Sequence, residues 1–149
     1  MFLLSRMLVG NTPPIVYMQP TDGETYQVGE ALKLASGKVT LCSGAVAPSH
    51  VCVGPIDDNG VVPCVEVQKY MEFETTLGVA PADSATVGVD PADSATDGVA
   101  PADSATVGVG DKVTLHTDGM QVTATKTGGV AEVTGIDGQT VGSRVTVKF

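Results

Sequence analysis

The segment VEVQKYMEFETTL, Val65–Leu77, belongs to the longest stretch of the chain without glycine or proline. Its odd positions are mostly apolar, and its even positions include Glu66, Glu72 and Glu74. Such alternation is typical of β-strands, in which successive side chains point to opposite faces. Lys69 interrupts the apolar set. The segment therefore predicts one or two strands, with a bend at this lysine.

The same pattern of strands and turns continues on both sides of this segment. Residues 31–41 (ALKLASGKVTL) and 112–125 (KVTLHTDGMQVTAT) predict hairpins, because two alternating stretches flank a short turn sequence. The sequence DDNG at 57–60 predicts a further turn, and residues 129–136 and 143–149 predict further strands. We therefore expect at least seven strands, little helix and an all-β fold, either a compact β-barrel or a β-sandwich.

Residues 1–20 are predicted to form an extended N-terminal arm, and residues 21–149 a single β domain. Three prolines disfavour a helix in the arm, which also lacks the basic start and cleavage site of a signal peptide. The arm carries an apolar set with no periodic partner of its own: Phe2, Leu3, Leu4, Met7 and Leu8. We predict that this set docks on another protein rather than joining the core. Removal of residues 1–14 would then leave a folded β domain that attaches more weakly.

A ten-residue unit, VAPADSATVG, is repeated three times over residues 79–108. The middle copy carries Asp90 and Asp97 in place of alanine and valine. Excision of residues 79–98 would leave one unit joining two strands, and a long surface loop adds little closure entropy. We predict that the repeats project from the domain as a loop, with Asp90, Asp93 and Asp97 exposed at its tip.

The composition excludes several classes of partner. The chain has 149 residues, a formal net charge of −9 and only eight lysines and arginines, which form no stripe. It therefore lacks the electrostatic footprint of a nucleic-acid-binding protein. No segment approaches the length of a transmembrane helix, so we expect no membrane partner. Aromatic residues make up 4% of the chain, and such a thin core favours stabilisation by an oligomer or a larger assembly.

No group of residues has the spacing of a known catalytic or metal site. Cys42, His50, Cys52 and Cys64 are too far apart for the usual structural zinc patterns, so we interpret them as buried thiols and a loop histidine. The odd number of cysteines, three, fits a reducing compartment. A disulfide between Cys42 and Cys52 is neither required nor excluded by the sequence. Ser49 beside His50 lacks the context of a nucleophile elbow. We therefore expect no enzyme activity, no metal and no cofactor.

Four segments together resemble a known family: YQVGEALKL (26–34), MEFETTL (71–77), VGDKVTLHTDGMQVTA (109–124) and VGSRVTVKF (141–149). They resemble the small β-rich head-decoration proteins, also called head-fibre proteins, of tailed bacteriophages. The resemblance covers residues 21–149 apart from the extra repeats, which depart from the family. It implies a β fold, a homo-trimer on the outer surface of the capsid, and an arm that docks on the major capsid protein.

The resemblance thus implies a structural virion protein that is made in the host cytoplasm and stabilises or decorates the capsid. It supplies no catalytic residues. An alternative is a surface-exposed binding module on the virion, in which the acidic repeats contact a host cell or a glycan. A third class is a stand-alone enzyme or metal protein. Co-purification with capsids at a fixed copy number, glycan or cell binding, and metal content distinguish the three.

Overall fold

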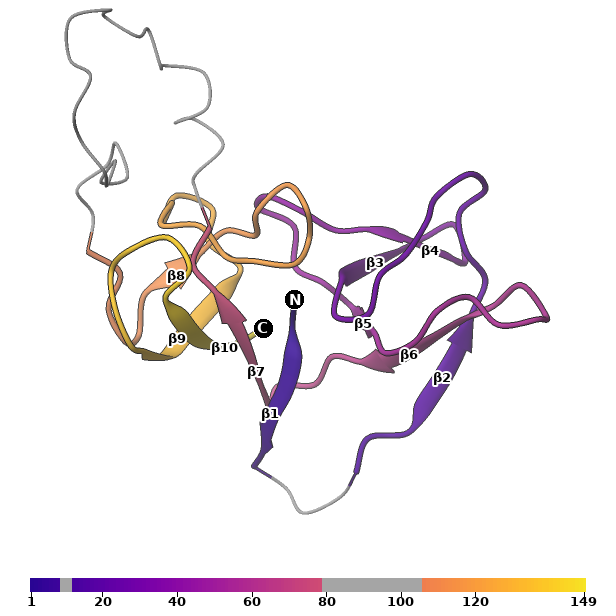
Figure 1. Ribbon diagram of the computed structural model, residues 1–149, viewed down its shortest axis with the longest axis horizontal. Helices are drawn as coiled ribbons and strands as arrows, with labels where there is room; N and C mark the ends of the chain where they lie inside the picture. The colour runs from indigo at the N-terminus through magenta and orange to yellow at the C-terminus, as the bar shows by residue number, and fades with distance from the viewer. Residues whose placement is uncertain (9–11, 79–105) are drawn as a thin grey trace, which may run out of the picture.

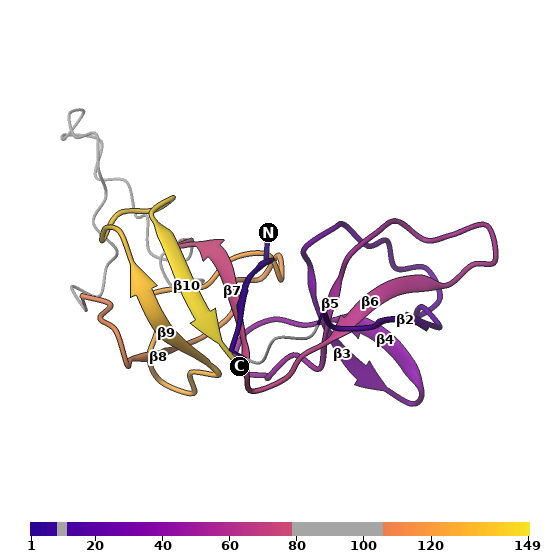
Figure 2. The ribbon, with the colours of Figure 1, turned by 90° about the horizontal axis from the view of Figure 1, so that it is seen from below.

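The computed structural model describes residues 1–8, 12–78 and 106–149, and over these residues the chain is all-β, without any helix. Ten strands form two antiparallel sheets of five strands each. Neither sheet is closed on itself, so the barrel alternative is wrong, while the arrangement is consistent with a β-sandwich. The two sheets occupy separate halves of the molecule, and both chain ends lie between them (Figures 1 and 2).

The first sheet has the strand order β1-β7-β10-β9-β8 and the second has the order β2-β6-β5-β3-β4. The first sheet consists of β1 (Leu3–Met7), β7 (Met71–Thr76), β8 (Lys112–Val113), β9 (Ala131–Ile136) and β10 (Arg144–Lys148). The second consists of β2 (Ile15–Met18), β3 (Ala31–Ala35), β4 (Lys38–Leu41), β5 (His50–Cys52) and β6 (Val62–Glu66). The two N-terminal strands therefore lie at the edges of different sheets.

The segment Val65–Leu77 connects the two sheets. Strand β6 ends at Glu66 in the second sheet, and β7 begins at Met71 in the first. The predicted bend at Lys69 is therefore confirmed, and it lies in the link between two strands. The segment Val65–Leu77 therefore supplies one strand to each sheet, and its link joins the two halves of the molecule.

Strand β7 keeps the predicted alternation. Phe73 is 1% exposed and points into the core. On the other face, Glu72 pairs with Arg6 of β1 at 3.0 Å, and Glu74 lies 3.6 Å from Arg144 of β10. Both partners of the Glu74–Arg144 pair are exposed, so this pair contributes little stability. Glu72 is buried although its partner Arg6 is exposed, so the ion pair offsets part of the cost of burying this carboxylate.

Both predicted hairpins are present. Strands β3 and β4 are joined by Ser36 and Gly37, whose φ angles of 51° and 79° suit the tight turn that matches strand twist. In the second hairpin, the Thr123 N–H donates to the Thr114 carbonyl at 2.9 Å. Of the residues 112–125 in this hairpin, only Lys112 and Val113 belong to a regular strand, β8. Single bridges from Val122 to Leu115 and Leu77 bring this hairpin back to the end of β7.

Two clusters of buried side chains form the interior, and we call them the main core and the second core. The main core draws on strands and loops of both sheets: Phe2, Ala31, Cys42, Val51, Val65, Met71, Phe73, Leu77, Val107, Val113, Leu115, Val122, Ala124, Ala131, Val133, Val145 and Val147. The second core belongs to the second sheet: Tyr26, Leu32, Val39, Cys52, Val62 and Cys64. Strands β5 and β6 and the start of β3 thus contribute side chains to both cores, whereas β2 and the ends of β3 and β4 stay partly exposed.

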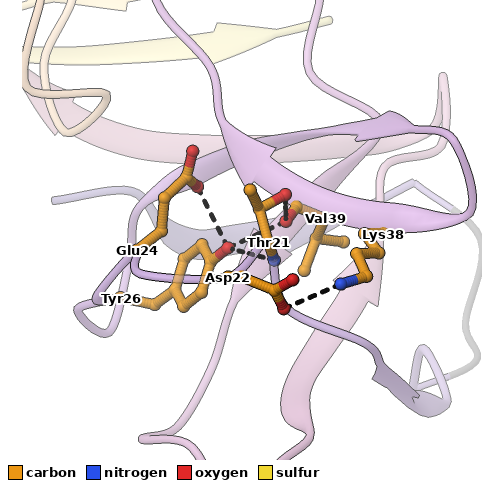
Figure 3. Close-up of polar contacts among 6 residues, drawn as sticks. All are labelled: Thr21, Asp22, Glu24, Tyr26, Lys38 and Val39. Atoms are coloured by element: carbon orange, nitrogen blue, oxygen red, sulfur yellow. Dashed lines mark hydrogen bonds and ion pairs between the residues drawn. The ribbon is translucent and has the colours of Figure 1, made fainter.

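Tyr26 closes the second core with a polar cluster (Figure 3). Its hydroxyl accepts the Thr21 N–H at 3.0 Å. The single hydroxyl proton has two acceptors within reach, the Val39 carbonyl at 2.8 Å and Glu24 Oε2 at 3.0 Å. Burial acts to raise the pKa of Glu24, but hydrogen bonds from neighbouring groups, the Tyr26 hydroxyl among them, outweigh it, so this pKa lies below its ordinary value. The tyrosine is therefore held at both its ring and its hydroxyl.

The N-terminal residues differ from the predicted arm. Strand β1 pairs with β7 in the first sheet, and β2 pairs with β6 in the second. Phe2 is 2% exposed, and its ring packs edge-on against Phe149 with 5.4 Å between ring centroids. The prediction that Phe2 lies outside the core is therefore wrong. The reason is that β7 offers a pairing partner about 70 residues away, which local sequence does not reveal.

Both ends of the repeat segment are anchored. Leu77 is buried and donates its N–H to the Ser143 carbonyl at 2.9 Å. Val107, in the third copy, is 2% exposed, and the Gln139 side-chain amide bonds both its N–H and its carbonyl at 2.8 Å. Residues 79–105 lie outside the described residues, and with them the predicted tip formed by Asp90, Asp93 and Asp97.

Candidate functional site

An apolar groove lies where the start of β1 meets the second sheet. Its volume is about 230 Å³. The lining residues belong to or adjoin β1, β5, β6, β7 and the loop before β3, and none is charged: Phe2, Leu3, Leu4, Val28, Val51, Cys52, Val53, Val65 and Phe73. The groove is therefore built by both sheets and has no charged side chain in its lining, and its one titratable residue, Cys52, belongs to the second core.

The groove has a buried floor and an exposed rim. Phe2, Val51, Val65 and Phe73 belong to the main core and form the floor. The rim side chains are between 37% and 46% exposed: Leu3, Leu4, Val28 and Val53. An apolar rim of this kind, continuous with a packed floor, is typical of a surface that another molecule covers.

A glycine lets the two sides of the groove approach. The Phe2 N–H donates to the Gly29 carbonyl at 2.7 Å, and the Gly29 N–H donates to the Cys52 carbonyl at 2.7 Å. Gly29 has a φ of 84°, and a Cβ atom there would lie 2.9 Å from the Phe2 carbonyl oxygen. Any other residue would be strained and would push β1 away. Gly29 therefore fixes the width of the groove.

The structure brings together some of the predicted docking residues. Leu3 and Leu4 lie on the rim, and Phe2 lies on the floor. Met7 is half-buried and packs against the main core, and Leu8 is exposed but does not line the groove. Docking of the exposed leucines on another protein stays a prediction.

Sequence reasoning missed the part of the groove that the second sheet supplies. Val51 and Val53 flank Cys52 and share one face of β5 and its extension, so their spacing of two was a usable signal. Nothing local placed that face beside β1. The groove therefore became visible only when the two sheets were assembled.

A buried carboxyl group lies next to the glycine that shapes the groove. Glu30 is 6% exposed. Burial raises its pKa, as do the negative charges of Asp118 and Glu24, whereas the Gln27 N–H, which donates to Glu30 Oε2 at 2.7 Å, acts to lower it. At neutral pH the ionised form is therefore a source of instability in the folded state.

We expect Glu30→Gln to raise the melting temperature at pH 7–8 by about 2–5 °C, because the amide keeps an acceptor for Gln27 and removes the charge. A folded-state pKa above the unfolded value destabilises the protein above that pKa. The gain should therefore shrink as pH falls through the folded pKa towards the ordinary value of 4.5. Exposed Asp58→Asn makes the same charge change as a control. An equal gain in both variants would attribute the effect to net charge.

The thiols and the histidine do not assemble into one site. Cys42 lies in the main core, whereas Cys52 and Cys64 lie in the second core, and all three are free. Ser49 Oγ and His50 Nδ1 share a hydrogen bond of 2.8 Å, and burial lowers the pKa of His50 despite the nearby carboxylate of Glu66. Neither Ser49 nor His50 lines the groove. No group of three metal-ligating side chains gathers within the described ranges.

A second hollow, of about 270 Å³, lies beside β8, β9 and the end of β10, and its lining combines charged side chains with Val130 and Phe149. Three lysines line it, Lys69, Lys112 and Lys148, together with Glu132. Lys148 pairs with Glu132 at 2.9 Å, which neutralises part of the positive charge. Such a small cluster does not match the extended basic surface that nucleic-acid binding requires.

No described part of the chain forms a helix that is long and apolar enough to cross a membrane. Among the hollows described above, the apolar groove combines a buried floor with an exposed apolar rim, and we take it as the candidate functional site. Comparison with known proteins adds no further candidate. No protein-family model, no curated protein and no solved structure matches this chain.

Proposed function

We propose that this chain is a structural virion protein that binds the outer surface of a tailed-phage capsid and stabilises or decorates it. The observation that supports this most directly is the apolar groove, whose rim exposes Leu3 and Leu4 at the edge of a sheet. The resemblance of four strand-and-turn segments to head-decoration proteins supplies the class of partner, the major capsid protein. The proposal includes a homo-trimer, which that family resemblance also implies.

The chemistry of the groove favours assembly over catalysis. Its lining is apolar, whereas an active site needs a few convergent polar or titratable groups. The buried floor gives the groove a fixed shape, and the exposed rim offers apolar area that a partner can remove from water. These are the properties of the central patch of a protein interface.

The position of β1 limits how a partner can dock. It is an edge strand, with one side paired to β7 and the other unpaired within the described sheet. Its register shifts between Leu4 and Arg6, and such a bulge discourages continuous pairing with a strand of another chain. We therefore propose docking through the side chains of Leu3 and Leu4 rather than through added strand hydrogen bonds.

The test is the number of copies on purified capsids, measured by quantitative mass spectrometry for virions that carry variant proteins. Leu3→Thr with Leu4→Thr keeps strand propensity but removes apolar contact. Each change should weaken docking by about 1–1.5 kcal/mol, roughly tenfold. Leu34→Thr, at a leucine that is 51% exposed on β3, is the matched control and should leave the copy number unchanged.

Unchanged occupancy in the double variant would reject docking through the groove. Absence of the wild-type chain from purified virions would reject the function itself. Binding of the free protein to host cells or glycans would instead support the alternative of a surface-exposed binding module.

A further inference from the structure

Two of the three cysteines face each other across neighbouring strands. Cys52 on β5 and Cys64 on β6 are directly opposite in the antiparallel register. Both belong to the second core, so their side chains lie on the same face of the sheet. Cys52 is 1% exposed and Cys64 is 0% exposed. The two thiols are therefore neighbours in a closed space.

The hydrogen bonds around them show which kind of pair they form. The Val53 N–H donates to the Pro63 carbonyl and the Val67 N–H donates to the Ser49 carbonyl, both at 2.9 Å. Residues 53/63 and 49/67 are thus hydrogen-bonded pairs. Because the two kinds of pair alternate along an antiparallel ladder, Cys52 and Cys64 form a non-hydrogen-bonded pair.

This kind of pair suits a disulfide. Its Cα atoms are typically about 4.5 Å apart, with the side chains closer than in the other kind. Disulfides span Cα separations of about 4.4–6.8 Å. The bond can therefore form without moving the strands. Cys42 has no such opportunity, because it packs in the main core, where its thiol donates to the Val46 carbonyl at 3.2 Å.

We propose that Cys52 and Cys64 are an oxidation site, which closes to a cross-strand disulfide when the protein meets a low-molecular-weight disulfide such as oxidised glutathione. The proposal rests on strand register and burial and is independent of the proposed capsid function. It replaces the pairing of Cys42 with Cys52 that the sequence had left open, because those two residues lie in different cores.

The reaction is a two-step exchange. The thiolate of one cysteine attacks a sulfur of the small disulfide, forming a mixed disulfide and releasing one small thiolate. The second cysteine then loses its proton, and its thiolate attacks the protein sulfur of the mixed disulfide. The protein S–S bond forms and the second small thiolate leaves. Two protein thiols are oxidised, one small disulfide is reduced to two thiols, and the two protons pass to the two leaving thiolates.

Burial sets the rate of this reaction. It raises the pKa of Cys64 to about 12 and also raises the pKa of Cys52, so thiolate is scarce at neutral pH. The Cys52 thiol donates to the Gly54 carbonyl at 3.1 Å, which further holds it in place. Exchange in the intact protein is therefore slow, and it accelerates when the second sheet opens.

The experiment exposes the full-length protein at pH 8 to oxidised glutathione, with and without denaturant at the midpoint of unfolding, followed by dilution, alkylation and peptide mass spectrometry. We expect a Cys52–Cys64 cross-link with Cys42 alkylated, formed at least tenfold faster at the midpoint. The cross-link closes a short loop, since the two cysteines are 12 positions apart. It should raise the melting temperature by about 5–10 °C, and dithiothreitol should reverse the rise.

Two variants serve as matched controls. Cys42→Ala should give the same cross-link, and Cys64→Ala should give none. If a variant folds poorly, the peptide map of the wild-type protein still shows which two cysteines are cross-linked. A cross-link to Cys42, or glutathione adducts without a cross-link in both conditions, would overturn the proposal. Complete alkylation of all three cysteines after exposure at the midpoint would overturn it as well.

Discussion

Phe2→Ala is expected to lower the free energy of unfolding by about 3–4 kcal/mol, the usual effect of removing a buried aromatic ring. Phe2 is 2% exposed and lies in the main core, in contact with the ring of Phe149. Denaturant unfolding of the full chain measures the change. The midpoint should fall while the dependence on denaturant concentration stays the same, as expected when only the folded state loses contacts.

Leu8→Ala is the control for this prediction, because Leu8 belongs to the same N-terminal segment but is 56% exposed. It should change stability by less than about 0.5 kcal/mol. An equally small effect of Phe2→Ala would mean that Phe2 contributes nothing to the core and that the segment is an arm. Removal of residues 1–14 also removes β1, so the structure leads us to expect destabilisation of the first sheet rather than a fully folded domain.

Val107→Asp is expected to lower the free energy of unfolding by about 4 kcal/mol or more, because it places an unpaired charge in the main core. Val107 is 2% exposed, and Gln139 uses both of its amide groups on the Val107 backbone, so the new carboxylate gains no partner there. A small domain has only about 5–15 kcal/mol in total. Circular dichroism should show a large loss of melting temperature or a protein that is unfolded at 37 °C.

The matched control is Val109→Asp, two residues further on, where the valine is 69% exposed. It should melt within a few degrees of the wild type. Equal melting temperatures of the two variants would mean that burial of Val107 does not anchor the end of the third repeat to the main core. The middle copy has Asp97 at the place that corresponds to Val107, so the third copy differs from the second in the residue that the core requires.

Local pattern predicted much of the fold. The alternation in Val65–Leu77 predicted one or two strands with a bend at Lys69, and the structure has two; the turn sequence at Ser36 and Gly37 predicted a hairpin that is present. These predictions succeeded because strand faces and tight turns depend on residues that are close in sequence. The choice between barrel and sandwich depends on which distant strands pair, and no local pattern contains that information.

The candidate site shows the same limit. Leu3 and Leu4 were recognisable as apolar side chains without a local partner, and the structure places them on the groove rim. The role of Phe2 was misjudged because its partner strand, β7, comes about 70 residues later. Gly29 could not be singled out, because its importance comes from the close approach of Phe2 and not from the sequence around it.

The strand order also has a consequence for biosynthesis. All strands of the second sheet lie between residues 15 and 66, so this half of the molecule can fold while the rest is still being made. The first sheet is completed later, because β10 lies between β7 and β9 and follows every other described strand in the sequence. Strand β1 is made before the other described strands, yet its neighbour β7 gains its second neighbour only when β10 has been made. Strand β1, with its exposed Leu3 and Leu4, therefore waits without a complete sheet while the second sheet is made, and chaperone binding to nascent chains should concentrate there.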